Sequence, residues 1–130
     1  MIFVDTSAWF ARFVADDPDH ARVAKWFEAN DERLVTSDYC IDETLTLLIA
    51  RKRPRLALQV GQQLFAQAIC SIHFLTSDII NRAWILFQQQ AASRWSFTDC
   101  TSKVVIDELG IRAAVASDVH FRAFGIVVLP

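Results

Sequence analysis

The feature of this sequence that most constrains its fold is the alternation of short β-branched runs with longer stretches of helical periodicity. The runs predicted as strands are Ile2–Val4, Leu34–Thr36, Ser71–Thr76, Ala113–Ala116 and Ile126–Leu129. Strands that alternate with helices imply parallel strands joined by crossover connections. The runs show little apolar and polar alternation, which is typical of a sheet buried on both faces. We therefore predict a three-layer α/β/α fold with a mostly parallel five-stranded sheet.

Capping residues and prolines delimit the predicted helices. The expected ranges run from Thr6 or Ser7 to about Val14, from Asp17-Pro18 onward, from Ser37 or Asp38 to about Arg51, from Pro54 to about Ala68, from Ser77-Asp78 to about Ala91, and from Ser96–Thr98 to about Leu109. Gly110 is expected to end the last helix. The apolar side of the first helix (Ala8, Trp9, Phe10, Phe13) fits either ordinary core or a partner surface.

Composition limits the class of protein. With 130 residues, 53% hydrophobic and 22% charged, the chain is expected to form one domain over 1–130 and is not disordered. The net charge of −2 does not point to nucleic acid, although a bound metal would offset local acids. Cys40, Cys70 and Cys100 lack metal-ligand spacing and are expected to be free thiols. With no signal peptide or apolar membrane span, we expect a cytoplasmic protein.

Four acidic residues are expected at one edge of the sheet. Asp5 follows the first strand, Glu43 lies in the helix after the second, and Asp118 follows the fourth. Asp99 stands at the start of the helix that precedes the fourth strand. Open parallel sheets bind ligands outside the carboxyl ends of their strands, so this edge is the predicted site.

Each acid also has a structural interpretation. Asp5 and Asp118 fit helix caps, and Asp99 fits a first-turn acid or a partner of Lys103. Glu43 shares an apolar stripe of its helix, where an unpaired carboxylate is costly. The neighbouring hydroxyls either orient these carboxylates or cap helices; they are Thr6, Ser7, Ser96, Thr98 and Ser117.

Clustered carboxylates recruit a cation. No His or Cys is expected among them, and His120, although close to Asp118 in sequence, is expected to face solvent. An all-oxygen site favours Mg²⁺ or Mn²⁺ over Zn²⁺, and carboxylates around such ions serve phosphodiester hydrolysis in nucleases.

Basic residues divide into a run and scattered positions. The run over 51–55 is expected to be a solvated loop. Better candidates for phosphate contact lie closer in sequence to the acids; they are Arg12, Lys25, Arg94 and Arg122.

The ordered set of motifs resembles the PIN-domain family, in particular VapC-like toxins of bacterial toxin–antitoxin pairs. The matching stretches are Phe3–Ala8, Ser37–Leu47, Ser96–Cys100 and Ala116–Phe121 with the closing Phe124–Pro130. The resemblance implies a Mg²⁺- or Mn²⁺-dependent endoribonuclease with Asp5, Glu43, Asp99 and Asp118 as its acidic centre. It also implies a homodimer and inhibition by a small antitoxin protein. Lys103 departs from the family pattern, which leaves open whether it enters the site and whether one or two metals act.

Three other functions make different demands on the sequence. A PIN-fold module that only binds RNA or docks a partner stays open as an alternative. A signalling receiver domain would need paired acids after the first strand, where a single acid stands. A dinucleotide-binding domain needs a glycine-rich loop, which three isolated glycines do not provide.

Overall fold

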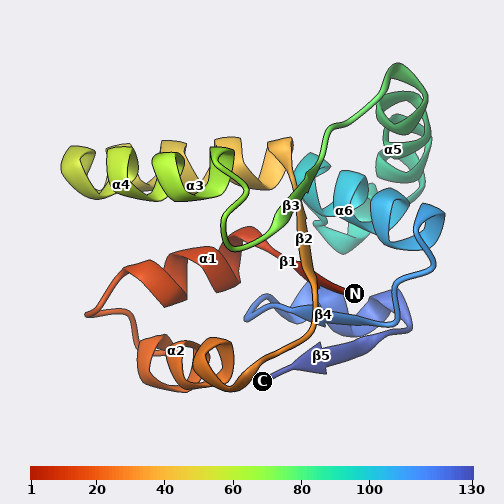
Figure 1. The fold of residues 1–130 in the computed structure, drawn as a ribbon. Coiled ribbons are helices and arrows are strands. Elements are labelled where there is room, and N and C mark those ends of the chain that lie inside the picture. The colour runs from red at the N-terminus through yellow and green to blue at the C-terminus, as the bar shows by residue number, and fades with distance from the viewer.

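Five short parallel strands form the centre of the computed structural model, which describes residues 1–130 (Figure 1). They are β1 (Ile2–Val4), β2 (Leu34–Ser37), β3 (Ser71–His73), β4 (Ala113–Val115) and β5 (Val127–Leu129). Their order in the sheet is β3-β2-β1-β4-β5, and every neighbouring pair is parallel. The predicted fold class is confirmed, with a sheet that is wholly parallel.

The helices cover the sheet on two faces. The helices of one face are α1 (Thr6–Phe13), α2 (His20–Ala29), α3 (Asp38–Ala50) and α4 (Pro54–Phe65); the other face carries α5 (Ser77–Gln89), α6 (Phe97–Glu108) and the 3₁₀ segments η1 (Ala91–Ser93) and η2 (Val119–Phe124). In Figure 1, α1–α4 lie to the left of the sheet and α5 and α6 to its right. Ile2 and Val4 of β1 pack into the first core, and Phe3 between them packs into the second.

The crossovers define a switch point at the centre of the sheet. From β1 the chain moves to β2 and β3 through α1–α4, and then returns through α5 and α6 to β4 on the other side of β1. The carboxyl ends of β1 and β4 therefore lie side by side, and the Asp5 N–H donates to the Val115 carbonyl at 3.0 Å. Ligand crevices of open α/β sheets form at such a point.

Most predicted boundaries agree with the structure within a few residues. Four differ: β3 ends at His73 rather than Thr76, α4 ends at Phe65, α2 begins at His20 two residues after Pro18, and Thr76 caps α5 in place of Ser77 or Asp78. The β3 segment is at the sheet edge, where the chain leaves the ladder early to reach the Thr76 cap.

The expected end of the last helix is confirmed. Gly110 has φ +63°, the left-handed region that favours glycine. Its N–H donates to Asp107, and the next N–H, of Ile111, donates to Ile106, which is the pairing of a Schellman motif. This turn leads directly into β4.

Buried residues confirm the core interpretation of the first helix. Ala8 and Trp9 are fully buried, and Phe10 is 9% exposed. The Trp9 indole N–H donates to the Thr36 hydroxyl, which in turn donates to the Val4 carbonyl, so α1 is fixed against β1 and β2.

No helix in the structure has the length and apolar character needed to cross a membrane.

Candidate active site

A cleft of about 330 Å³ opens at the carboxyl edge of the sheet, next to the switch point between β1 and β4. All four predicted acids line it. The remaining lining residues are Thr6, Ser7, Leu47, Arg94, Ser96 and His120. Residues from α1, α3, the start of α6 and the start of η2 thus meet in one place, as the sequence predicted.

Asp5 and Ser7 form one end of the acidic site, here called the Asp5 corner. Asp5 caps α1, and its Oδ2 accepts hydrogen bonds from the Ser7 N–H at 3.1 Å and the Ser7 hydroxyl at 2.6 Å. Asp5 is 4% exposed, and no cationic side chain pairs with it. Burial raises the pKa of Asp5 to about 7; the Ser7 bonds lower it, and the nearby Asp99 and Glu43 carboxylates raise it.

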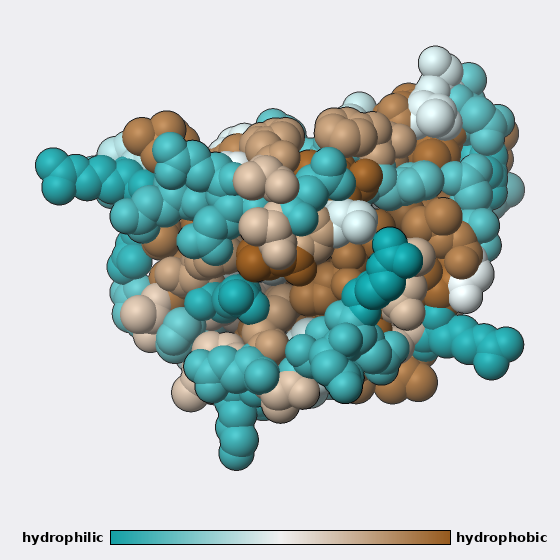
Figure 2. Space-filling model, in the orientation of Figure 1, coloured by the Kyte–Doolittle hydropathy of each residue, from teal (hydrophilic) through white to brown (hydrophobic).

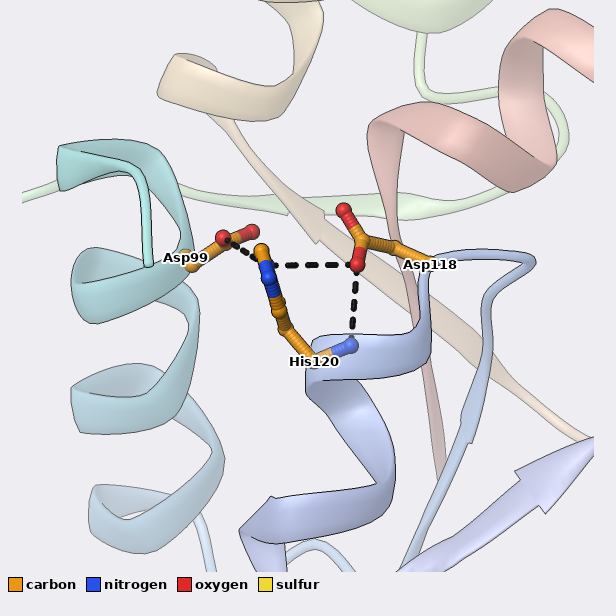
Figure 3. Close-up of side chains that lie close together, drawn as sticks. All are labelled: Asp99, Asp118 and His120. Atoms are coloured by element: carbon orange, nitrogen blue, oxygen red, sulfur yellow. Dashed lines mark hydrogen bonds and ion pairs between the residues drawn. The ribbon is translucent and has the colours of Figure 1, made fainter. Parts of the chain in front are cut away.

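Asp99, Asp118 and His120 form the second group, here called the His120 corner (Figure 3). Asp99 is the third residue of α6 and makes a reciprocal capping box with Ser96. The His120 Nδ1 lies between the two carboxylates, 3.0 Å from Asp99 Oδ2 and 3.3 Å from Asp118 Oδ1. Asp118 caps η2 by accepting from the His120 N–H at 2.9 Å.

Each aspartate of the site commits only one carboxylate oxygen to the protein. Asp5 and Asp99 use Oδ2, and Asp118 uses Oδ1. Glu43 is partly buried in the cleft, and its side chain makes no hydrogen bond or ion pair. None of these uncommitted oxygens is completely buried, since the Ser117 hydroxyl is the one fully buried side-chain polar atom that lacks a partner.

This donor set fits a divalent cation. Four carboxylates line one cleft, each with at least one oxygen that the chain leaves uncommitted. The raised pKa of Asp5 shows that its charge lacks compensation in the protein alone. Hard divalent ions prefer oxygen ligands of this kind.

The predicted hydroxyls have different positions. Thr6, Ser7 and Ser96 line the cleft, and Ser7 also accepts from the Ser117 N–H at 3.0 Å, which ties the ends of β1 and β4 together. Ser117 and Thr98 do not line the cleft, and the Thr98 backbone carbonyl accepts a hydrogen bond from the Thr101 hydroxyl at 2.7 Å. The orienting interpretation holds for the Ser7 hydroxyl, which donates to Asp5, whereas Asp5 itself caps α1. The capping interpretation holds for the Ser96 hydroxyl, and the Asp99 carboxylate is held by the Ser96 backbone N–H.

His120 corrects the prediction that no histidine joins the acids. Its side chain is 28% exposed and turned inward onto Asp99 and Asp118, not out to solvent. The Asp118 cap starts η2, and the packing of η2 against α6 brings the His120 ring to Asp99. The site is therefore carboxylate-rich but not purely oxygen-lined.

Lys103 is outside the site. Its Nζ pairs with Asp107 at 2.6 Å, one helical turn further along α6, and not with Asp99. The question that the sequence left open for this residue is thereby answered.

The basic residues that the sequence proposed for phosphate contact lie in different parts of the molecule. Of the four scattered candidates, Arg94 lines the cleft, whereas Arg12, Lys25 and Arg122 do not. Arg12 stacks on Phe27 and lines a larger cavity of about 460 Å³ at the amino ends of β2 and β3. That cavity mixes Asp31 and Glu32 with Arg12 and Arg33 and has no carboxylate cluster, so its size does not make it the chemical centre.

The fold and the acidic cleft agree with a family comparison, in which the PIN domain matches residues 2–126. The chain belongs to the PIN-domain family.

Its relatives in this family are ribonucleases by name. The chain is 32% identical over 127 residues to the 23S rRNA-specific endonuclease VapC20 of Mycobacterium tuberculosis, covering 98% of this chain and 96% of that one. It is 29% identical to ribonuclease VapC26 of the same species, covering 94% of this chain and 90% of the other.

A solved PIN structure is similar throughout. The crystal structure of M. tuberculosis VapC20, described as a sarcin–ricin loop cleaving toxin, matches with a TM-score of 0.93 at 31% identity. The match covers 100% of both chains. The parallel sheet and the helices around it are therefore those of a VapC-type PIN domain.

Proposed function

We propose that this protein is a divalent-metal-dependent endoribonuclease, the toxin of a toxin–antitoxin pair, with residues 1–130 acting as one nuclease domain. The observation that carries the proposal is the convergence of Asp5, Glu43, Asp99 and Asp118 on one cleft, each with an uncommitted oxygen. The likeness to VapC20 and VapC26, both named as RNA-cleaving enzymes, supports RNA as the substrate.

The metal is proposed to be Mg²⁺ or Mn²⁺. Asp5, Glu43 and Asp99 would hold it directly or through water, and Asp118 would complete the site or position the attacking water. A bound divalent ion supplies a nucleophile at neutral pH and offsets negative charge on the leaving oxygen.

The chain's own residues prepare this site. Ser7 holds Asp5 Oδ2, so Oδ1 is the oxygen left for a ligand. The His120 ring holds Asp99 Oδ2 and the His120 backbone N–H holds Asp118 Oδ1, so one residue fixes both carboxylates before any ligand arrives. We propose His120 as a positioning residue of the site on this basis.

The proposed partners follow the same family. A small antitoxin protein would inhibit the enzyme, and the protein would act in the cytoplasm, where its three free cysteines stay reduced. A homodimer is supported by exposed apolar side chains at α5 and just before it, where Phe74, Trp84 and Ile85 are each more than half exposed; a second such set lies on α3 and α4, with Ile49, Leu58 and Phe65. Figure 2 shows hydrophobic surface on the side that carries α5 and α6.

The test is RNA cleavage by antitoxin-free protein with Mg²⁺, with Mn²⁺ and with a chelator. The substrates are structured RNAs that include the sarcin–ricin loop hairpin, because that loop is the one named for the VapC20 structure. We expect metal-dependent cutting that falls by about 100-fold or more in Asp5→Asn, since even the outer partners of metal ligands contribute roughly 10- to 100-fold.

The control for this test is Asp42→Asn, an exposed acid on the same helix as Glu43 but outside the cleft. Cleavage by Asp5→Asn at the wild-type rate would contradict the assignment. RNA binding without metal and without any cutting would favour the alternative, a PIN-fold module that only binds.

A further inference from the structure

The cleft contains one permanent cation, and the acidic centre does not use it. Of the 13 Lys and Arg residues, only Arg94 lines the cleft. Four other basic side chains pair with acids, among them Arg22 with Asp19, Arg53 with Asp16 and Lys103 with Asp107, and none of them lines the cleft. Arg94 stands beside four carboxylates, yet its guanidinium makes no hydrogen bond or ion pair within the chain.

The backbone at Arg94 does not explain an arginine there. The residue ends η1 with φ +60°, a left-handed conformation in which Gly or Asn is favoured. A side chain that is exposed and unpaired at such a position contributes little to folding. Its role must therefore be sought in what the cleft binds.

The segment that carries Arg94 is held firmly on the next two residues. The Trp95 ring packs on Phe124 with centroids 4.9 Å apart. Ser96 is locked to Asp99 by the capping box, with both bonds between 2.9 and 3.0 Å. The root of the Arg94 side chain is thus fixed at the rim of the cleft, one residue before the cap that holds Asp99.

RNA must bring several phosphates to a cleft whose acids repel them. A metal compensates the phosphate that is cut, but the flanking phosphates need a cation from the protein. Arginine is suited to this because its planar fork of donors matches phosphate oxygens and it keeps its charge at every working pH.

We propose that Arg94 binds a backbone phosphate of the RNA next to the one that is cut, and so sets the register of the strand in the cleft. This inference rests on the proposed ribonuclease function. Arg94 acts on binding in this scheme, because a rim contact to a flanking phosphate is equally strong before and during the chemical step.

The test compares Arg94→Gln and Arg94→Lys with the matched control Arg112→Gln. Arg112 is also exposed and unpaired, but it precedes β4 at the opposite edge of the sheet. Gln keeps the side chain long and is no more strained than Arg at a left-handed position, so folding is expected to be unchanged and is checked by Tm.

In metal-dependent cleavage we expect Arg94→Gln to raise KM about tenfold, with kcat within about twofold of wild type. Arg94→Lys should recover part of the loss, and Arg112→Gln should match wild type. An Arg94→Gln variant with unchanged KM, a loss confined to kcat, or an equal loss in Arg112→Gln would each overturn the proposal.

A binding experiment separates this inference from the proposed function. The affinity for the hairpin is measured over a range of salt concentrations for two proteins, the single variant Asp5→Asn and the double variant Asp5→Asn, Arg94→Gln. Loss of one phosphate contact should weaken binding and reduce the slope of log K against log salt by about 0.7. If wild type cuts no RNA, the proposed function fails, whereas an unchanged affinity and slope would refute the role of Arg94 itself.

Discussion

The two corners of the cleft hold the same chemical group in different ways. Asp5 and Asp99 are both aspartates at the start of a helix, both almost fully buried, and both accept two hydrogen bonds on Oδ2. Asp99 has an imidazole as one of its partners, but Asp5 has only the hydroxyl and N–H of Ser7. Although both stand at a helix start, Asp5 as the N-cap of α1 and Asp99 as the third residue of α6, only Asp5 lacks any partner other than one serine.

That difference shows that the charge of Asp5 is not needed for folding. Capping alone would be served as well by an uncharged Asn or Ser at the Asp5 position. The sequence retains a carboxylate whose pKa is raised to about 7 by burial, which costs stability at neutral pH. A bound cation would remove this cost, so the Asp5 corner is the part of the site where metal binding should be most visible in stability.

The largest effect on stability is expected when the charge of Asp5 is removed. Its pKa is about 7 in the folded protein against an ordinary value of 3.8, so the folded state binds the proton more tightly. The contribution of Asp5 to the free energy of unfolding therefore falls as pH rises from about 4 to about 7, and stays low above that. Asp5→Asn should match wild type near pH 4 and exceed it by about 2–4 kcal/mol at pH 8 in metal-free buffer.

Urea unfolding at several pH values measures this difference. Asp99→Asn serves as the comparison, because the Asp99 carboxylate is hydrogen-bonded to both the Ser96 N–H and the His120 ring and its replacement is expected to give no gain in stability over wild type. A gain of equal size in both variants would show that general repulsion among the acids, rather than the isolation of Asp5, sets the cost.

A divalent ion should reduce the stability cost of the Asp5 charge, which is the difference between the two corners. Binding to the folded state alone stabilises it by about 3 kcal/mol when the ion is at roughly 100 times its Kd. We expect Mg²⁺ or Mn²⁺ to raise the Tm of wild type at pH 8 and to raise that of Asp5→Asn much less. The baseline is the Tm of chelator-treated protein without divalent ions. The exposed-acid variant Asp42→Asn is the control, and its Tm should rise as much as that of wild type. An equal rise in all three proteins would contradict ion binding at Asp5.

The acidic site was predictable in part because its members follow from local rules. Asp5, Asp99 and Asp118 each stand at the start of a helical segment, and parallel strands bring those starts to one edge. His120 was not predictable in this way. Its ring meets Asp99 only because η2 packs against α6, a contact between segments that sequence periodicity does not describe.

The same limit applies to the basic residues. Arg12 lies in the helix that Asp5 caps, yet it faces the opposite edge of the sheet, where it stacks on Phe27. Arg94 directly follows a short turn without any periodic signal, and it lines the acidic cleft. Distance along the chain places a residue near a site only when the direction of the side chain is also known, and that direction is set by tertiary packing.

The smallest effect on stability is expected when a hydrogen bond to Asp5 is removed and its carboxylate is kept. Ser7→Ala removes the hydroxyl that donates to Asp5 and accepts from the Ser117 N–H. Loss of these bonds should lower the free energy of unfolding by about 1–2 kcal/mol. Because the Ser7 hydroxyl lowers the pKa of Asp5, the pKa should also rise further in the variant, and the pH range over which stability falls should extend upward. The shift should vanish in the Asp5→Asn background, where no proton is left to titrate; persistence there would place the pH dependence at the His120 corner instead.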